Sequence, residues 1–296
     1  MINDVSPSAI GVLLVLYNPS SADLTHVETV ASRYRGVVVD NSASRSFPDD
    51  RVGQMAYLPL GDNMGIAHAQ NVGLRWLLSQ EDIQYVVFFD QDSRFAMSYP
   101  QEMVGEYVRI RCAVPRLALL GPTLVDSDSQ AEYKSVFHAD AAAVQGFVPR
   151  RDVISSGSVV SRAVLQSVGL MIGRLFIDYV DFEWCWRAER QGYVCGQTRN
   201  MRISHSVGIS RFTWMGYMVQ VWSPFRYFYQ YRNYVWLSTL AYTPRQWIFA
   251  TGVKSLLRLV YFPFFIKNGL RCWMQMWRGL ATAVCQLGRF RKEVRG

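Results

Sequence analysis

The chain has 296 residues, of which 50% are apolar and 18% are charged, so it can bury a sizeable core and is not a disordered chain. Five cysteines, odd in number and without a CxxC spacing, argue against a disulfide framework or a zinc site and fit a reducing compartment. The net charge of +8 is uneven, because residues 199–296 hold 15 of the 31 basic residues and a single acidic residue, Glu293. Such a segment favours an anionic partner: a membrane surface, a phosphorylated lipid or a nucleic acid.

The first part of the chain alternates short apolar runs with helical patterns. Strands are predicted at 10–16, 36–40, 55–60 and 85–90, and helices at 23–34 and 66–78. This alternation is typical of a largely parallel sheet with crossover helices. The first apolar run follows Asp4 without a basic segment, so the pattern predicts a strand and not a signal peptide.

Beyond residue 110 the pattern is less regular. It predicts a strand at 117–120, a polar loop or hairpin at 126–147, and helices at 162–168 and 181–191. Gly192 marks the end of the last of these helices.

From about residue 215 the sequence changes to long, aromatic-rich helical runs. Residues 246–266 have the length of a membrane span, but Lys254, Arg258 and Pro263 interrupt it. Charges near the centre of a span are costly, so the pattern favours a helix that lies in the membrane interface. The alternative is a cationic helix packed on the surface of the domain.

Two carboxylates one residue apart, Asp90 and Asp92, follow a predicted buried strand in the stretch FFDQDS, residues 88–93. A divalent cation would relieve their mutual repulsion, and hard oxygen donors suit Mg²⁺ or Mn²⁺. The alternative is an Asp-rich turn whose carboxylates accept hydrogen bonds from backbone amides. Ligands gather at the carboxyl ends of parallel strands, where Asn18 and Asp40 also stand.

Three further stretches carry candidate chemistry. In DYVDFEWCWR, residues 178–187, the acids either cap a helix or include a general base. His205 is either structural or a third metal ligand. Residues 61–74, GDNMGIAHAQNVGL, either form a tight turn or let the backbone approach a phosphate at a helix N-terminus.

Together these motifs resemble the family 2 glycosyltransferases in identity and order. The segments that carry the resemblance are VLYNP (15–19), VVVDNS (37–42), NMGIAHAQNVG (63–73), FFDQDS (88–93), SSGSVVSR (155–162), DYVDFEWCWR (178–187) and His205. The bacterial rhamnosyltransferase branch is more similar still, given DQDS, DYVDFEWCWRA and FRYFYQYRN at 225–233. The resemblance spans about residues 10–240.

The resemblance implies an α/β fold of the GT-A type: a mixed, mostly parallel sheet flanked by helices. Residues 1–215 would form the nucleotide-sugar-binding and catalytic domain, and residues 216–296 a basic, aromatic, amphipathic helical extension. The implied reaction is an inverting, metal-dependent transfer of L-rhamnose from dTDP-β-L-rhamnose to a lipid-linked saccharide in surface polysaccharide or O-antigen biosynthesis. The alternative is another sugar, such as galactofuranose or N-acetylglucosamine, from a UDP donor.

The resemblance also assigns residues by position. Asp181 matches the catalytic base; Val180 replaces the Glu that many relatives carry beside it, so Asp178 or Glu183 could share this role. Asp92, His205 and Asp90 match the metal site, for Mg²⁺ or Mn²⁺. The residues matched to the nucleotide sugar are Tyr17, Asn18, Asp40, Asn63, Gly65, Asn71 and Asp90.

The expected partners are dTDP-rhamnose, the lipid-linked saccharide acceptor and a membrane surface bound through the C-terminal helices. The expected location is cytoplasmic, peripheral on the cytoplasmic face of the inner membrane. Nucleic acid is not an expected partner, because no recognition motif accompanies the basic residues. A non-catalytic lipid-binding scaffold is the remaining alternative class, and self-association stays open.

Overall fold

The computed structural model describes residues 5–126, 146–205, 210–214 and 217–295. The chain divides into two compact units. The first consists of residues 1–173 and 184–206, and the second of residues 174–183 and 207–296. A short segment from the middle of the sequence therefore belongs to the same unit as the C-terminal helices.

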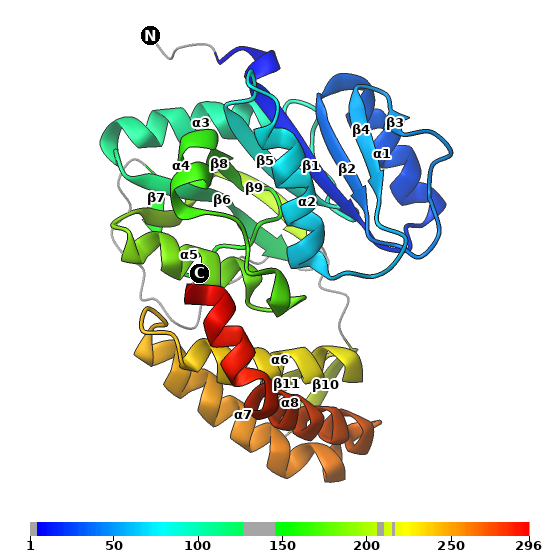
Figure 1. Ribbon diagram of the computed structural model, residues 1–296, viewed down its shortest axis with the longest axis vertical. Helices are drawn as coiled ribbons and strands as arrows, with labels where there is room; N and C mark the ends of the chain where they lie inside the picture. The colour runs from blue at the N-terminus through cyan, green and yellow to red at the C-terminus, as the bar shows by residue number, and fades with distance from the viewer. Residues whose placement is uncertain (1–4, 127–145, 206–209, 215–216, 296) are drawn as a thin grey trace. The chain divides into compact units, whose positions relative to one another are not determined.

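The first unit is built on a sheet in which nine strands are described, in the order β3-β4-β2-β1-β5-β8-β6-β9-β7 (Figure 1). The strands are β1 (Ile10–Leu16), β2 (Gly36–Asp40), β3 (Arg51–Val52), β4 (Met55–Pro59), β5 (Tyr85–Asp90), β6 (Leu117–Asp126), β7 (Phe147–Pro149), β8 (Val159–Ser161) and β9 (Val194–His205). The pairs β1–β2, β1–β5, β2–β4 and β6–β9 are parallel. The other pairs are antiparallel, which confirms the expected mixed, largely parallel sheet.

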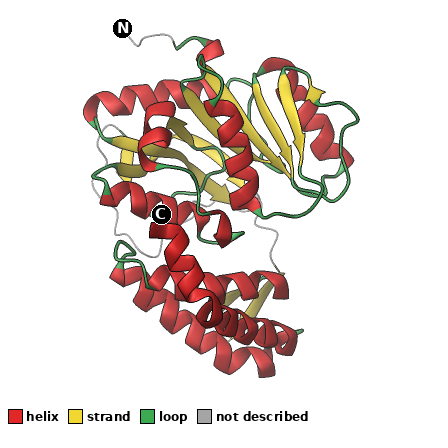
Figure 2. Ribbon diagram, in the orientation of Figure 1, coloured by secondary structure: helices red, strands yellow, loops and turns green. Residues whose placement is uncertain are grey.

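Helices flank this sheet (Figure 2). They are α1 (Ser21–Arg33), α2 (Ile66–Leu78), α3 (Tyr99–Ala113) and α4 (Arg162–Val168), with a 3₁₀ turn at Pro7–Ala9, another at Gly173–Leu175, and α5 (Val180–Arg190), whose first turn belongs to the second unit.

The central strand β1 shows how the layers form, because all seven of its residues are buried. Val12 and Leu14 belong to the same apolar cluster as residues of α1 and α3. Leu13 faces α2, where a Cβ at position 73 would lie 2.8 Å from the Leu13 Cδ1 atom. Gly73 thus allows the close approach of α2. A strand covered on both faces has the continuous apolar sequence seen here.

The structure adds the short strands β3, β7 and β8 to the sequence-based elements of the first unit, and it differs from them in three larger features. Helix α3 was not predicted, because Gly105 and several β-branched residues weaken its helical signal. Strand β6 continues to Asp126, and β9 runs over 12 residues to His205. Residues 127–145, where a polar loop or hairpin is predicted, lie outside the described residues.

Besides residues 174–183, the described part of the second unit contains a hairpin and three helices. They are β10 (Ser210–Trp214), β11 (Tyr217–Val221), α6 (Pro224–Ser238), α7 (Arg245–Phe265) and α8 (Gly269–Arg295). Aromatic side chains supply much of the packing: Tyr227 and Phe262 meet edge to face, and Trp236 stacks on Phe290 with ring centroids 4.8 Å apart. The Trp236 indole nitrogen also donates a hydrogen bond to the Ala283 carbonyl at 3.0 Å. The expected aromatic helical run is confirmed from residue 224 onward, whereas residues 217–221, which the pattern also assigned to it, form strand β11.

Candidate active site

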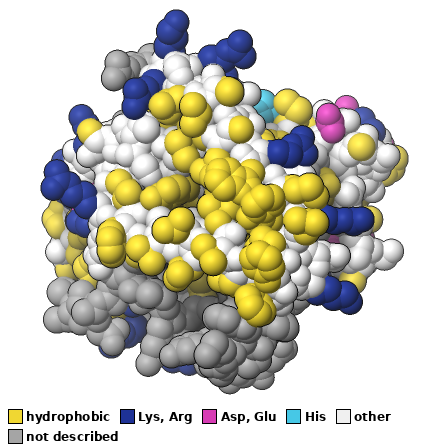
Figure 3. Space-filling view, turned by 90° about the horizontal axis from the view of Figure 1, so that it is seen from below, with side chains coloured by type: hydrophobic (Ala, Val, Ile, Leu, Met, Phe, Trp, Pro, Cys, Tyr) yellow, Lys and Arg dark blue, Asp and Glu magenta, His cyan; other side chains and the backbone are white. Residues whose placement is uncertain are grey.

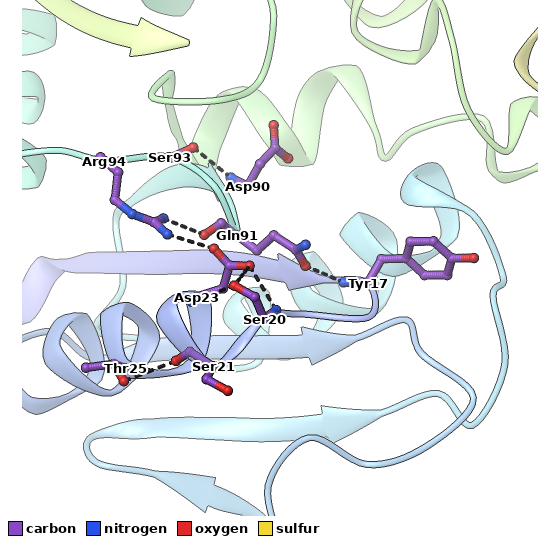
Figure 4. A network of polar contacts seen from close by, with 9 residues as sticks. All are labelled: Tyr17, Ser20, Ser21, Asp23, Thr25, Asp90, Gln91, Ser93 and Arg94. Carbon is purple, nitrogen blue, oxygen red and sulfur yellow. Dashed lines mark hydrogen bonds and ion pairs between the residues drawn. The ribbon is translucent and has the colours of Figure 1, made fainter. Parts of the chain in front are cut away.

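The parallel strands β2, β1 and β5 place several candidate residues at one edge of the sheet. Leu16 pairs with Asp40, and Val15 pairs with Asp90. Beyond the strand ends, the Tyr17 backbone nitrogen donates to the Gln91 side-chain oxygen at 2.6 Å, as Figure 4 shows. The Asn18 nitrogen donates to the Ser42 hydroxyl at 2.8 Å. The polar loops at the carboxyl edge of the sheet are therefore joined to one another by hydrogen bonds.

Asp40 is completely buried and orders the loop that follows β2. Its carboxylate accepts hydrogen bonds from the Ser42 nitrogen at 3.1 Å, the Ser46 nitrogen at 2.9 Å and the Tyr57 hydroxyl at 2.6 Å. Burial acts to raise the Asp40 pKa, but these hydrogen bonds outweigh it and hold the pKa below its ordinary value. Asp40 is thus kept ionised within the edge.

Asp90 and Asp92 lie on a tight turn after β5. The Asp90 nitrogen lies 3.2 Å from the Ser93 hydroxyl and its carbonyl accepts from the Ser93 nitrogen at 3.1 Å, and in Figure 4 the Asp90 side chain extends away from this contact. Asp92 is exposed, whereas Ser93 is buried and bonds to the Ser156 hydroxyl at 2.7 Å. The turn is anchored through its serine, and both aspartates stand on it.

Arg94 ties the same turn to α1. Its guanidinium donates to the Gln91 carbonyl at 2.8 Å and to Asp23 at 2.7 Å (Figure 4). Asp23 in turn completes a capping box with Ser20 at the start of α1. The position of the aspartate turn is therefore coupled to the first helix.

The donor chemistry of this turn fits a hard divalent cation, because both carboxylates offer oxygen ligands. His205 ends β9, and its side chain lies outside the described residues. Among the residues that the structure describes, no group of three His, Cys, Asp or Glu side chains is positioned to hold a metal ion.

The loop before α2 is held by asparagine side chains. Asn41 donates to the Asn63 side-chain oxygen at 2.9 Å and accepts from the Met64 nitrogen at 2.7 Å. Gly65, with φ of 83°, precedes the first residue of α2 and leaves that helix N-terminus without a side-chain cap. The sequence had not singled out Asn41, although it stands directly after Asp40.

Asn71 is engaged with the backbone of Met171. Its side-chain nitrogen donates to the Met171 carbonyl at 2.8 Å, and its side-chain oxygen accepts from the Met171 nitrogen at 2.8 Å. Asn71 is also buried, so within the first unit it fastens α2 to the segment after α4.

Three acids surround the start of α5, and they differ in burial. Asp178 forms an ion pair with Arg226 and is 7% exposed. Glu183 is fully buried and accepts a hydrogen bond from the Tyr242 hydroxyl at 2.6 Å. Asp181, the third, lies half-buried in the first turn of α5. Anions in the first turn of a helix are stabilised by its dipole and free amides.

The residues before α5 have an unusual backbone. Phe176, Asp178 and Tyr179 have φ values of 65°, 67° and 64°. Such conformations cost side-chain-bearing residues about 1–3 kcal/mol each and persist only where the surrounding structure enforces them.

Comparison with known proteins supplies the family. No protein-family model matches the chain. The chain is 31% identical to dTDP-rhamnosyl transferase RfbF of Shigella flexneri over 241 residues, which cover 76% of this chain and 78% of that protein. The chain belongs to the family 2 glycosyltransferases, in their bacterial rhamnosyltransferase branch. It is therefore a glycosyltransferase.

Solved structures agree on the fold. The crystal structure of S. aureus TarS 1–349 matches with a TM-score of 0.54 and 14% identity, over 96% of this chain and 87% of that one. GalNAc-T7 with UDP, GalNAc and Mn²⁺ matches with a TM-score of 0.56 and 12% identity, over 94% of this chain and 57% of that one. These likenesses confirm the GT-A type fold of the glycosyltransferase.

Proposed function

We propose that this glycosyltransferase moves L-rhamnose from dTDP-β-L-rhamnose to a saccharide acceptor with inversion at the anomeric carbon. The observation that carries the proposal is the identity to a dTDP-rhamnosyl transferase over most of both chains. The polar carboxyl edge of the first unit supports it, since open α/β sheets bind ligands there.

The donor nucleotide would lie along this edge. Tyr17 is 49% exposed directly after β1, so its ring can stack on the thymine, while Asn18 and the ionised Asp40 border the base. Asn63 and Gly65 lie at the free N-terminus of α2, which suits the ribose and diphosphate. Asn71 supports this arrangement by holding α2 against Met171.

Asp92 and Asp90, with His205, would hold Mg²⁺ or Mn²⁺ beside the diphosphate. A bound divalent cation acts as a Lewis acid that stabilises the negative charge on the departing dTDP. Asp90, which is less exposed than Asp92, would also face the nucleotide sugar.

Asp181 would be the general base. The two alternative acids near the start of α5 are less accessible: Asp178 is 7% exposed, and Glu183 is fully buried. Asp181 is the acid whose half-buried position at a helix N-terminus suits an ionised group that accepts a proton from the acceptor hydroxyl. One base without a nucleophile gives a single displacement, and hence an α-L-rhamnoside from the β-linked donor.

The second unit would bind an anionic membrane surface, where a lipid-linked acceptor in polysaccharide or O-antigen synthesis resides. Within the described residues, α7 is the one helix long and apolar enough to cross a membrane, and only 11% of its most apolar window is buried. Six of its exposed apolar side chains form one helical stripe, and Phe265, also exposed, lies outside it. The six are Phe249, Val253, Leu256, Leu257, Val260 and Phe264.

The positions of the basic residues support an orientation of α7 parallel to the membrane plane. Lys254 lies within α7, and Lys267 and Arg271 are exposed just beyond it. In Figure 3 apolar side chains gather on one face, with basic side chains towards its rim. Glu293, the single acidic residue after position 198, is paired with Arg174. An apolar face with cationic flanks binds the interface of anionic bilayers, here the cytoplasmic face of the inner membrane.

The test is a panel of nucleotide sugars incubated with the enzyme and Mn²⁺ while nucleoside diphosphate release is followed. We expect release from dTDP-β-L-rhamnose well above that from UDP-N-acetylglucosamine or UDP-galactofuranose. Release from a UDP donor alone would replace the proposed donor, and release from none, with acceptor lipids present, would contradict the proposed function.

A further inference from the structure

The motif FRYFYQYRN, residues 225–233 on α6, has no part in the chemistry described above. Within the second unit, five of its side chains contact one short segment, residues 174–178. The contacting side chains are Phe225, Arg226, Tyr229, Arg232 and Asn233. This segment leads directly into α5, whose first turn carries Asp181.

Asn233 makes the densest of these contacts. It is completely buried, and its side-chain nitrogen lies 2.9 Å from the Leu175 carbonyl, 2.8 Å from the Ile177 carbonyl and 3.1 Å from the Asp178 carbonyl. Three carbonyl groups therefore converge on one donor group. Buried backbone carbonyls need hydrogen-bond partners. This amide supplies such a partner to a curved segment that is neither an α-helix nor a strand, and so stabilises it.

Arg232 and Arg226 fix the same segment from either side of Asn233. The Arg232 guanidinium donates to the Arg174 carbonyl at 2.8 Å and the Leu175 carbonyl at 3.0 Å. Arg226 pairs with the Asp178 carboxylate. The polar contacts to residues 175–178 described here come from α6, whereas Arg174 is also paired with Glu293 of α8.

Ring packing completes the restraint. Phe176 stacks on Tyr229 with centroids 4.5 Å apart and planes 8° from parallel, and Phe225 meets Phe176 edge to face. Phe176 is one of the three residues with positive φ just before α5. The contacts of α6 thus fall on the part of the backbone that is least favourable without them.

The strained residues adjoin the start of the helix that bears Asp181. The Glu183 nitrogen donates to the Tyr179 carbonyl at 3.0 Å, and Tyr179 itself has a φ of 64°. Rotation at residues 178–179 would therefore turn the first turn of α5. Asp181 lies between two anchored acids, Asp178 held by Arg226 and Glu183 held by Tyr242.

We propose that Asn233, together with Arg226 and Arg232, positions Asp181: the three side chains hold residues 175–178 in the conformation that aims the carboxylate of Asp181 at the acceptor hydroxyl. This role rests on the proposed function of Asp181 as the base. Asn233 is a positioning residue, since its contacts are with the backbone that precedes α5. Catalysis by a base depends steeply on its placement, so loss of the restraint lowers the rate and leaves donor binding in place.

The test is a double-mutant cycle of Asn233→Ala and Asp181→Asn, read as dTDP release from dTDP-β-L-rhamnose with water as acceptor. Tyr231→Phe is the matched control, because it removes a 2.6 Å hydrogen bond from α6 to the Ser255 carbonyl of α7. We expect Asn233→Ala to lower kcat about 100-fold with KM within about 3-fold, and Tyr231→Phe to change kcat by less than about 3-fold. In the Asp181→Asn background, Asn233→Ala should add less than about 3-fold.

Each other result has a definite meaning. An equal loss from Asn233→Ala in both backgrounds, or a loss carried by KM, overturns the positioning role and leaves Asp181 as the base. Near-normal turnover of Asp181→Asn would show that Asp181 is not the base, and would overturn the proposed function of this residue. If release by Asp181→Asn is below detection, the kinetics of Asn233→Ala alone decide the matter. A loss in kcat supports the positioning role, and a loss carried by KM overturns it.

A milder variant covers the case in which Asn233→Ala does not fold. Arg226→Gln removes the partner of Asp178 at a partly exposed position, and Arg226→Lys keeps the positive charge. We expect about a 10-fold loss of kcat for the first and recovery of most of it for the second. Unchanged kcat in Arg226→Gln overturns the proposal.

Discussion

The two units differ in where they leave large apolar side chains exposed. In the described part of the first unit, Tyr17 and Met64 are the exposed ones, and both lie at the polar carboxyl edge of the sheet. The described part of the second unit exposes twelve, most of them on α7 and α8. Exposed apolar surface of this kind marks sites that bind a ligand, another protein or a membrane. The difference suggests a small stacking surface for a ligand in one unit and a broad docking face in the other.

Asp181→Asn should give the largest effect. It separates turnover, which depends on an acid of the second unit, from dTDP binding, which is proposed for the first. We expect dTDP release from dTDP-β-L-rhamnose to fall by about 10³-fold or more, because the amide cannot accept the proton. Binding of dTDP, measured by calorimetry, should stay within about 3-fold, since its proposed contacts lie in the first unit. Glu189→Gln on the same helix, which breaks an ion pair with Arg151, is the control and should keep its activity.

Asp92→Ala, a change in the first unit, should instead weaken binding of the nucleotide. We expect Mn²⁺-supported binding of dTDP to weaken about 10- to 100-fold, because the cation loses a carboxylate ligand. Asp82→Ala removes an exposed acid paired with Arg35 and should not alter binding. Calorimetric titrations with Mn²⁺ or with EDTA make the comparison; equal affinity of the native enzyme in both would rule out the proposed metal site.

Acidic substitutions on α7 probe the docking face of the second unit. Leu256→Glu with Val260→Glu should weaken binding to vesicles of anionic phospholipid about 10-fold or more, because two exposed apolar contacts become negative charges. Leu256→Met with Val260→Ile keeps the face apolar and should bind normally. Both double variants should release dTDP in water at the native rate. Unchanged vesicle sedimentation by the acidic pair would contradict membrane docking through this stripe.

The smallest expected effect is on stability and concerns the buried Asp40. Its lowered pKa means that the ionised form is favoured in the folded state, so its contribution to stability is present above the unfolded pKa of about 3.9 and is lost as pH falls through the lower folded value. Asp40→Asn should cost about 1–3 kcal/mol at pH 7. Urea unfolding from pH 7 to pH 3 should show this difference shrink in acid, and a difference independent of pH would contradict the assignment.

Local pattern was enough to predict the parts of the fold that depend on continuous apolar runs. Strands β1, β2 and β5 are such runs, and parallel pairing brings their carboxyl ends together, as expected for Asn18, Asp40 and Asp90. The aromatic helices of the second unit were likewise visible. Helix α3 was not, because its residues have weak helical preference and the helix depends on packing against the sheet.

The states of the individual acids could not be predicted. The partner of Asp178 is 48 residues away and that of Glu183 is 59 residues away, so neither spacing nor motif distinguished these acids from Asp181. The engagement of Asp40 by Tyr57 and of Asn71 by Met171 depends on the folded sheet in the same way. Residue types identified the candidates, whereas the burial and the partners of Asp178, Glu183, Asp40 and Asn71 follow from tertiary contacts.

The central claim is a single displacement of dTDP from dTDP-β-L-rhamnose, and the anomeric form of the first product tests it most directly. The enzyme, Mn²⁺ and donor can be mixed in water and the released sugar followed by proton NMR before mutarotation equilibrates the anomers. The account predicts that α-L-rhamnose forms first, together with dTDP, and that Asp181→Asn abolishes both signals. Formation of β-L-rhamnose first, or undiminished release by Asp181→Asn, would contradict it.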